Sequence, residues 1–115
     1  MLNLASDTKV FLALGATDMR KAINGLTVIV SEQMQLEIFS GHLFVFCNRQ
    51  QTILKILYWD KSGFCLWQKR LEKDQFKWPQ TPKEVMNITG QELSWLIAGL
   101  NISQAHKSLK YSMIS

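Results

Sequence analysis

The chain has 115 residues, 47% of them hydrophobic and 19% charged, a composition that excludes an intrinsically disordered protein. Two cysteines are too few for a secreted disulfide scaffold, and no window of eighteen consecutive apolar residues exists that could cross a membrane. The net charge of +4 favours a polyanion or an acidic protein as partner. We expect a cytoplasmic protein with one domain over residues 1–100 and a tail over residues 101–115, for which docking onto the domain stays open.

The first predicted elements are a strand over residues 9–14 and an amphipathic helix over residues 18–34. Apolar side chains recur at every third or fourth position through the second segment, which is the spacing of one helix face. Thr17 or Asp18 is the expected N-cap, because a side-chain oxygen there accepts hydrogen bonds from free N–H groups of the first turn.

Three apolar runs follow, over residues 42–47, 52–59 and 64–71. Short polar turns at residues 48–51 and 60–63 connect them, and turns of that length favour a three-strand antiparallel meander. The middle run is apolar on both faces, so both faces of the sheet should be covered. The first helix can cover one face, and either the C-terminal segment or another subunit can cover the second.

The last predicted elements are a short strand over residues 85–88 and a helix that begins after Thr89 and runs to about residue 100. Thr89 and Glu92 have the spacing of a capping box, in which each side chain accepts from the other residue's backbone N–H. The predicted fold is therefore α+β, with a mainly antiparallel sheet, a central three-strand meander and two packed helices.

No residue pattern predicts an active site, a metal site or a cofactor site. His42, Cys47, Cys65 and His106 could supply four zinc ligands, but they contain no close pair such as C-x-x-C, and two buried thiols are the favoured interpretation. Ser40, two residues before His42, is more simply a turn residue than a nucleophile. The nine acidic residues form no recognisable metal-binding set. We therefore expect a protein that is not an enzyme.

Positive charge is concentrated in residues 49–83, where eight basic side chains face three acidic ones. Basic and aromatic residues alternate there, a pattern typical of nucleic-acid binding, because cations neutralise phosphates and exposed aromatics stack on unpaired bases. The alternative is a solvated rim around a core, which is favoured for Trp67 and stays open for Trp59 and Trp78. The candidate contacts to nucleic acid or an acidic partner are Arg20, Lys21, Arg49, Lys55, Lys69, Arg70, Lys73 and Lys77.

Several ordered sequence blocks carry a family resemblance. They are TDMRK at residues 17–21 followed by Gly25-Leu26, FSGHLFVF at 39–46, KILYWD at 55–60, and GF, LW and KRLE within 63–72, followed by Phe76 and Trp78-Pro79. In this order and spacing, over about residues 8–100, they resemble the TnpB accessory proteins of the sixty-six class of bacterial insertion sequences. The resemblance implies a role in transposition beside a separate, larger transposase that carries the catalytic acids.

Two hypotheses follow for the function. The first is an accessory protein of insertion-sequence transposition that binds the DNA of the element's ends through a basic face. The second is a protein–protein assembly module, docking on the transposase or on a second copy, with Trp59 or Trp78 in the interface. The residues alone leave DNA, RNA and protein open as the direct partner.

Overall fold

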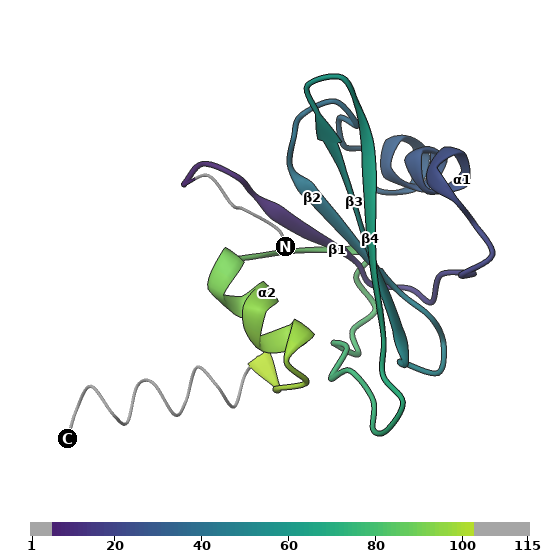
Figure 1. Cartoon of the computed structure of the whole chain (residues 1–115), viewed down its shortest axis with the longest axis vertical. Coiled ribbons are helices and arrows are strands. Elements are labelled where there is room, and N and C mark those ends of the chain that lie inside the picture. Colours follow the sequence, from purple (N-terminus) through teal and green to yellow (C-terminus); the bar gives the residue numbers. More distant parts are fainter. Residues whose placement is uncertain (1–5, 103–115) are drawn as a thin grey trace.

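The computed structural model describes residues 6–102, which form a five-stranded sheet with a helix on each face (Figure 1). The elements are β1 (Val10–Ala13), α1 (Ile23–Val28), a π-helical turn (Ile29–Gln33), β2 (Leu43–Cys47), β3 (Ile53–Asp60), β4 (Gly63–Arg70), β5 (Val85–Ile88) and α2 (Gly90–Ile97). The predicted α+β class is confirmed. No helix in this range has the length and apolar character needed to cross a membrane. The predicted tail lies outside the described residues beyond residue 102, so its docking stays a prediction.

The sheet has the strand order β4–β3–β2–β1–β5. Short turns join β2, β3 and β4 into the predicted antiparallel meander. β1 lies parallel to β2, because the crossover through α1 is long enough to return the chain to the same end of the sheet. β5 pairs antiparallel with the other side of β1, so that Val10 faces Leu43 on one side and Ile88 on the other.

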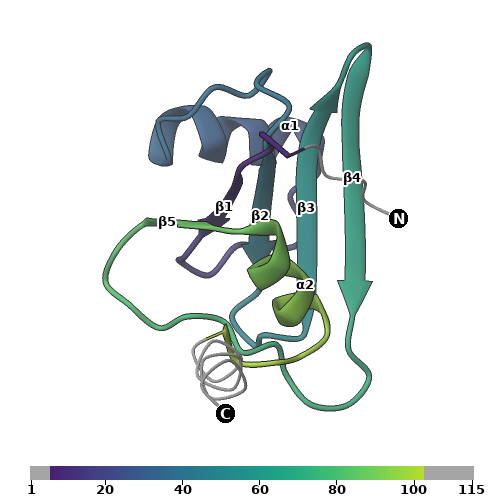
Figure 2. The same ribbon diagram turned by 90° about the vertical axis from the view of Figure 1, so that its left-hand side faces the viewer.

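Both faces of the sheet are covered by this chain itself. α1 and the π-helical turn cover one face, where Leu26 and Val30 pack with Phe44 and Leu57 of the strands. On the other face, Figure 2 shows α2 in front of the sheet. The core on the α2 side contains Val45, Ile56, Phe76, Trp78, Leu93 and Leu96. The second face is therefore covered by α2 together with the segment after β4.

The first helix begins later than the sequence predicts. It starts at Ile23 with Ala22 as an N-cap that offers no side-chain hydrogen bond, so the prediction of a helix from residue 18 with a Thr17 or Asp18 cap is wrong. The Asp18 carboxylate instead accepts from the backbone N–H of Arg20, which closes a local turn that competes with a helix.

Thr17 does not cap the helix either. It is buried, and its backbone N–H donates to the carbonyl of Cys47. The predicted helix changes at its other end as well. From Ile29 onward the turn widens to π-helical, with the Met34 N–H bonded to the Ile29 carbonyl. The apolar periodicity of the segment was predicted correctly, but a local turn and a long-range bond decide where the helix begins, and a π-turn changes how it ends.

The second helix carries the predicted capping box. Thr89 Oγ1 accepts from the Glu92 N–H at 3.0 Å, and Glu92 Oε1 accepts from the Thr89 N–H at 2.9 Å. The helix ends at Ile97 because Gly99 adopts a left-handed conformation with φ +85°. The Gly99 and Leu100 N–H groups then bond back to carbonyls of the last turn, as in a Schellman motif.

Candidate nucleic-acid interface

The loops at one end of the sheet carry most of the candidate cations, and we call this region the basic end. It consists of residues 14–22, 48–52 and 70–84. In Figure 1 the β2–β3 turn and the segment after β4 lie at the bottom, away from the β3–β4 hairpin at the top, and the loop before α1 runs out to the right. They carry seven basic and four acidic side chains. The opposite end of the sheet consists of residues 6–9, 34–42 and 60–62. It carries two basic and three acidic side chains, so the positive charge is segregated to one end.

The loop before α1 exposes Arg20 and Lys21. Arg20 has a side chain that is 91% exposed, and its Nη2 lies 2.7 Å from Oδ2 of Asp18. The hydrogen bonds from Arg20 hold the pKa of Asp18 at about 2, so this carboxylate keeps its charge far into the acid range. Arg20 is thus partly neutralised, and Lys21 carries the uncompensated charge of this loop because it forms no ion pair with residues 6–102.

Lys55 differs from the other candidates, because it is buried in β3 with only 8% of its surface exposed. Its Nζ donates to the carbonyl oxygens of Met19 at 2.9 Å and Lys21 at 3.1 Å. The expectation that Lys55 contacts a partner is therefore corrected. Lys55 is a positioning residue that fastens the loop carrying Arg20 and Lys21 to the sheet.

The turn between β2 and β3 presents Arg49 to solvent. Asn48 organises this turn, because its Oδ1 accepts from the N–H groups of Thr52 at 2.8 Å and Ile53 at 3.0 Å. Gln51 completes the turn with φ +62°, a left-handed conformation that non-glycine residues adopt at an energetic cost. The turn is thus held rigidly, and the Arg49 side chain projects from a fixed base.

Two candidate cations at the end of β4 already have partners. Lys69 is half-buried, and its Nζ donates to the carbonyl oxygen of Ile97 at 3.0 Å. A cation suits this position because the C-terminal end of a helix carries partial negative charge. Arg70 lies in solvent and contacts the Glu72 carboxylate, with Nη2 and Oε1 3.0 Å apart. Arg70 can exchange this exposed partner for a phosphate at low cost, whereas Lys69 is committed to α2.

The segment from β4 to β5 adds three exposed lysines, Lys73, Lys77 and Lys83, none of which is ion-paired within the part of the chain that the structure describes. Lys83 was not among the candidates, although its place in the basic stretch 49–83 was a signal for it. It joins the basic end because β5 pairs antiparallel with β1 and brings residue 84 against Leu14.

The two tryptophans left open by the sequence have opposite environments. Trp78 is only 6% exposed, and its Nε1 donates to the carbonyl oxygen of Leu14 at 3.0 Å, so its prediction as an interface residue is wrong. Trp59 is half-buried at the opposite end, with ring centroids 5.0 Å from those of Phe39 and Phe64. Phe39 itself is 54% exposed. We call Phe39, Trp59 and Phe64 the aromatic cluster.

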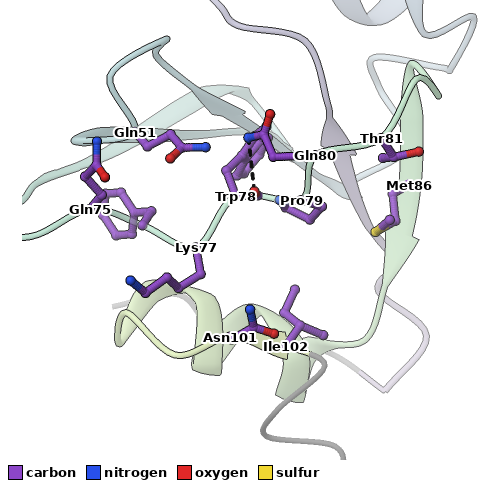
Figure 3. Close-up of a pocket in the computed structure, with 11 residues that line it drawn as sticks. Gln51, Gln75, Lys77, Trp78, Pro79, Gln80, Thr81, Met86, Asn101 and Ile102 are labelled. Carbon is purple, nitrogen blue, oxygen red and sulfur yellow. Dashed lines mark hydrogen bonds between the residues drawn. The ribbon is translucent and has the colours of Figure 1, made fainter.

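A cavity of about 510 Å³ opens at the basic end, beside the first residues after α2 (Figure 3). Four amide side chains line it, from Gln51, Gln75, Gln80 and Asn101, and Lys77 stands at its side. Sequence reasoning missed these amides, because uncharged polar residues in loops carry no spacing signal and come together only through the fold.

The other weighed residues have structural partners. His42 accepts a hydrogen bond from the backbone N–H of Lys9 through Nδ1, and Ser40 Oγ accepts from the His42 N–H. Cys47 lies in the core, and burial raises the pKa of its thiol to about 12. Among residues 6–102 no three His, Cys, Asp or Glu side chains come together to hold a metal ion, and His106 lies outside this range.

Comparison with known proteins places the chain in a family. Residues 8–107 match the family model described as IS66 Orf2 like protein. The chain is 36% identical over 101 residues to the uncharacterized protein y4hO of Sinorhizobium fredii, covering 88% of each chain. It is 30% identical over 101 residues to the uncharacterized protein y4jC of the same organism, covering 88% of this chain and 86% of the relative. No solved structure matches. With the resemblance of its sequence blocks now confirmed over nearly its whole length, the chain belongs to the IS66 Orf2-like family of insertion-sequence accessory proteins.

Proposed function

We propose that this protein assists insertion-sequence transposition in the cytoplasm by binding DNA at the element's ends through its basic end, beside the transposase of the same element. The observation that supports the proposal most is the gathering of exposed cations from three separate loops on one end of the sheet. Five of them form no ion pair with residues 6–102: Lys21, Arg49, Lys73, Lys77 and Lys83.

The arrangement of these cations suits the DNA backbone. Arg49 projects from a rigid turn and can bind a phosphate through two parallel N–H groups, whereas lysines act as mobile point charges. Arg20 and Arg70 each hold an exposed carboxylate two residues away, which a phosphate can displace. Phosphate contacts of this kind position a protein on a duplex without reading its sequence. In this proposal the protein supplies attachment and geometry, and the transposase supplies the chemistry.

The direct test is the salt dependence of binding to a duplex of the element's terminal sequence. We expect binding at low salt that weakens steeply as salt rises, because each neutralised phosphate releases counterions. The variant Arg49→Gln/Lys73→Gln/Lys77→Gln should lower the slope of log K against log salt by about three, roughly one for each lost contact.

The matched control is Lys61→Gln, which removes an exposed lysine in a turn at the opposite end. We expect it to leave both affinity and slope unchanged. Absence of DNA binding by the natural protein at low salt would show that the proposal is wrong. An equal effect of Lys61→Gln would show that net charge matters rather than the basic end.

A second candidate function is docking on the transposase or on a second copy of this chain, and the aromatic cluster favours it. The three rings contact one another, and Phe39 leaves more than half of its surface in solvent. Exposed aromatic anchors of this kind often dominate protein interfaces. Because the aromatic cluster and the basic end lie at opposite ends of the sheet, one molecule could hold DNA and a protein at the same time.

Sedimentation of the pure protein, and of its mixture with the transposase, tests this second function. We expect a complex or a self-associated species that Phe39→Ala weakens about tenfold or more, since anchor residues lose at least 1 to 2 kcal/mol on truncation. The control Val28→Ala removes an exposed apolar side chain from α1 instead. A strictly monomeric protein that does not bind the transposase would rule docking out.

A further inference from the structure

The cavity at the basic end has walls of two kinds. Figure 3 shows Asn101 and Ile102 across the opening from Trp78 and Pro79, with Met86 closing one side. The apolar side chain of Ile102 on one side and those of Trp78 and Pro79 on the other face each other across a volume of about 510 Å³, which is within the range that holds small organic groups. The cavity therefore offers two apolar walls, between which a flat ring can lie.

Among the described residues, the polar side chains that line the cavity are four amides, the Thr81 hydroxyl and one cation. The amides belong to Gln51, Gln75, Gln80 and Asn101, the positive charge belongs to Lys77, and no carboxylate lines the cavity within residues 6–102. An amide presents a donor and an acceptor side by side, which matches the edge of a nucleobase. The absence of a carboxylate from this lining also suits a ligand that carries phosphate.

Hydrogen bonds hold the side-chain amides of Gln75 and Gln80 in place and leave the amide of Gln51 available. Gln75 Nε2 donates to the backbone oxygen of Gln50 at 2.8 Å, which ties the segment after β4 to the β2–β3 turn. The Gln51 carbonyl accepts from the Phe76 N–H at 2.7 Å, so the same two segments are joined twice. The Gln51 side-chain amide makes no hydrogen bond with residues 6–102, and Figure 3 shows it extending toward Gln80.

The cavity continues toward a second cation. A smaller cavity of about 240 Å³ shares Gln51, Trp78 and Gln80 with the first and reaches Arg49. Gln51 and Gln80, which line both cavities, thus lie between Lys77 on one side and Arg49 on the other. A strand whose base enters between the amides would place the phosphates before and after that base near these two cations.

We propose that this cavity takes one unpaired nucleobase of the DNA strand that the basic end binds, with the base edge on the amides and the flanking phosphates near Lys77 and Arg49. This inference rests on the proposed DNA binding and adds a preference for ends or junctions that expose single-stranded nucleotides. Enclosing a base costs least when the base is already unpaired, so such DNA should bind better than a continuous duplex.

The test compares three probes: a blunt duplex of the element's terminal sequence, the same duplex with a short single-stranded overhang, and a free mononucleotide. We expect the natural protein to bind the overhang duplex about tenfold more tightly than the blunt one, the gain that one good base contact supplies. The free mononucleotide should bind far more weakly than either, because it lacks the phosphates that the basic end holds.

The informative variant is Gln51→Gly, which removes the amide at a position where φ +62° makes glycine the better residue. We expect it to fold at least as stably as the natural protein, to bind blunt duplex equally well, and to lose the preference for the overhang. The matched control is Gln35→Gly, the same substitution at an exposed glutamine with φ +56° at the opposite end. It should keep the preference.

The outcomes separate this inference from the proposed function. If the natural protein binds blunt and overhang duplexes equally, the cavity does not take a base, and DNA binding by the basic end still stands. If it binds neither duplex, both proposals are wrong. If the mononucleotide binds as tightly as the overhang duplex and depends on Gln51, the cavity serves a free nucleotide, and the proposal of a DNA strand is overturned.

Discussion

The two ends of the sheet use the same residue types in opposite ways. At the basic end the charges are outside and the large aromatics, Phe76 and Trp78, are inside. At the other end the charges are few, and Phe39 of the aromatic cluster is exposed. Position in the fold, and not residue type, therefore decides whether a tryptophan or a lysine can meet a partner.

The difference follows from what covers each end. The segment after β4 folds back beneath the sheet on the α2 side, which buries Trp78 and leaves its lysines in solvent (Figure 2). At the other end a tight hairpin joins β3 to β4, and the loop that carries Phe39 lies against Trp59 and Phe64. A long loop can enclose its aromatics, whereas a tight hairpin leaves them at the surface.

The largest expected effect is on the two tryptophans. Trp78→Ala should lower the free energy of unfolding by about 3 to 5 kcal/mol, because it empties a core site and removes the bond to the Leu14 carbonyl. Trp59→Ala should cost only about 1 to 2 kcal/mol, mainly through lost ring contacts. Urea denaturation of both variants checks this. Equal losses would show that the two ends are packed alike.

The next effect concerns Lys55. Lys55→Ala leaves the carbonyls of Met19 and Lys21 without their donor, and we expect a loss of about 2 to 3 kcal/mol in stability. DNA affinity should fall as well, although Lys55 touches no phosphate, because the loop with Arg20 and Lys21 is released. Lys61→Ala at the opposite end is the control, with a change in stability within about 0.5 kcal/mol. A Lys55→Ala protein of unchanged stability would show that Lys55 does not fasten this loop to the sheet.

A smaller effect is expected at the start of α2, which lies near the opposite end of the sheet. Thr89→Ala should cost about 1 kcal/mol, because it removes the acceptor for the Glu92 N–H. Thr89→Ser keeps the acceptor and should be nearly neutral. Binding of blunt duplex should be the same for both variants, since the change lies away from the basic end. A loss of DNA binding in Thr89→Ala would show that the start of α2 affects the basic end.

The smallest effect is the titration of Asp18. Its pKa is lowered from 3.8 to about 2 by hydrogen bonds from Arg20, so its contribution to stability is present above its usual pKa and is lost as pH falls toward 2. Denaturation between pH 5 and pH 2, monitored by fluorescence, should therefore be slightly less pH-dependent for Asp18→Asn. The same variant frees Arg20 and should bind DNA more tightly. Weaker binding would mean that the paired geometry of Arg20 is needed.

Local pattern predicted the central meander and the capping box correctly. Alternation along residues 52–59 and the polar turns on either side are local properties, as is the spacing of Thr89 and Glu92. The parallel pairing of β1 with β2 could not be predicted, because it depends on where the crossover through α1 returns the chain. The start of α1 could not be predicted from periodicity either, since Asp18 accepts from the Arg20 N–H in a turn and Thr17 is buried with its N–H bonded to the Cys47 carbonyl.

Only part of the candidate site could be predicted, because local sequence features show charge but not which side chains distant segments bury. The charge excess of the middle third identified Arg49, Lys73 and Lys77, which the fold brings together in solvent. Lys55 and Trp78 are buried against partners from distant segments. Charge and aromatic character alone therefore predicted, wrongly, that both would contact a binding partner. The amides of the cavity carry neither signal and were found only from the structure.

β1 lies between β2 and β5 in the sheet, and this position affects how the protein folds during synthesis. The meander β2–β4 pairs residues that are close in sequence and can form while the chain is still being synthesised. Of the strands, β1 is synthesised first, whereas its second neighbour, β5, is synthesised last, after the whole meander. The two loops that flank β1 and β5 at the basic end come side by side only in that last pairing. A nascent chain therefore carries most of its sheet before it carries its complete positive end.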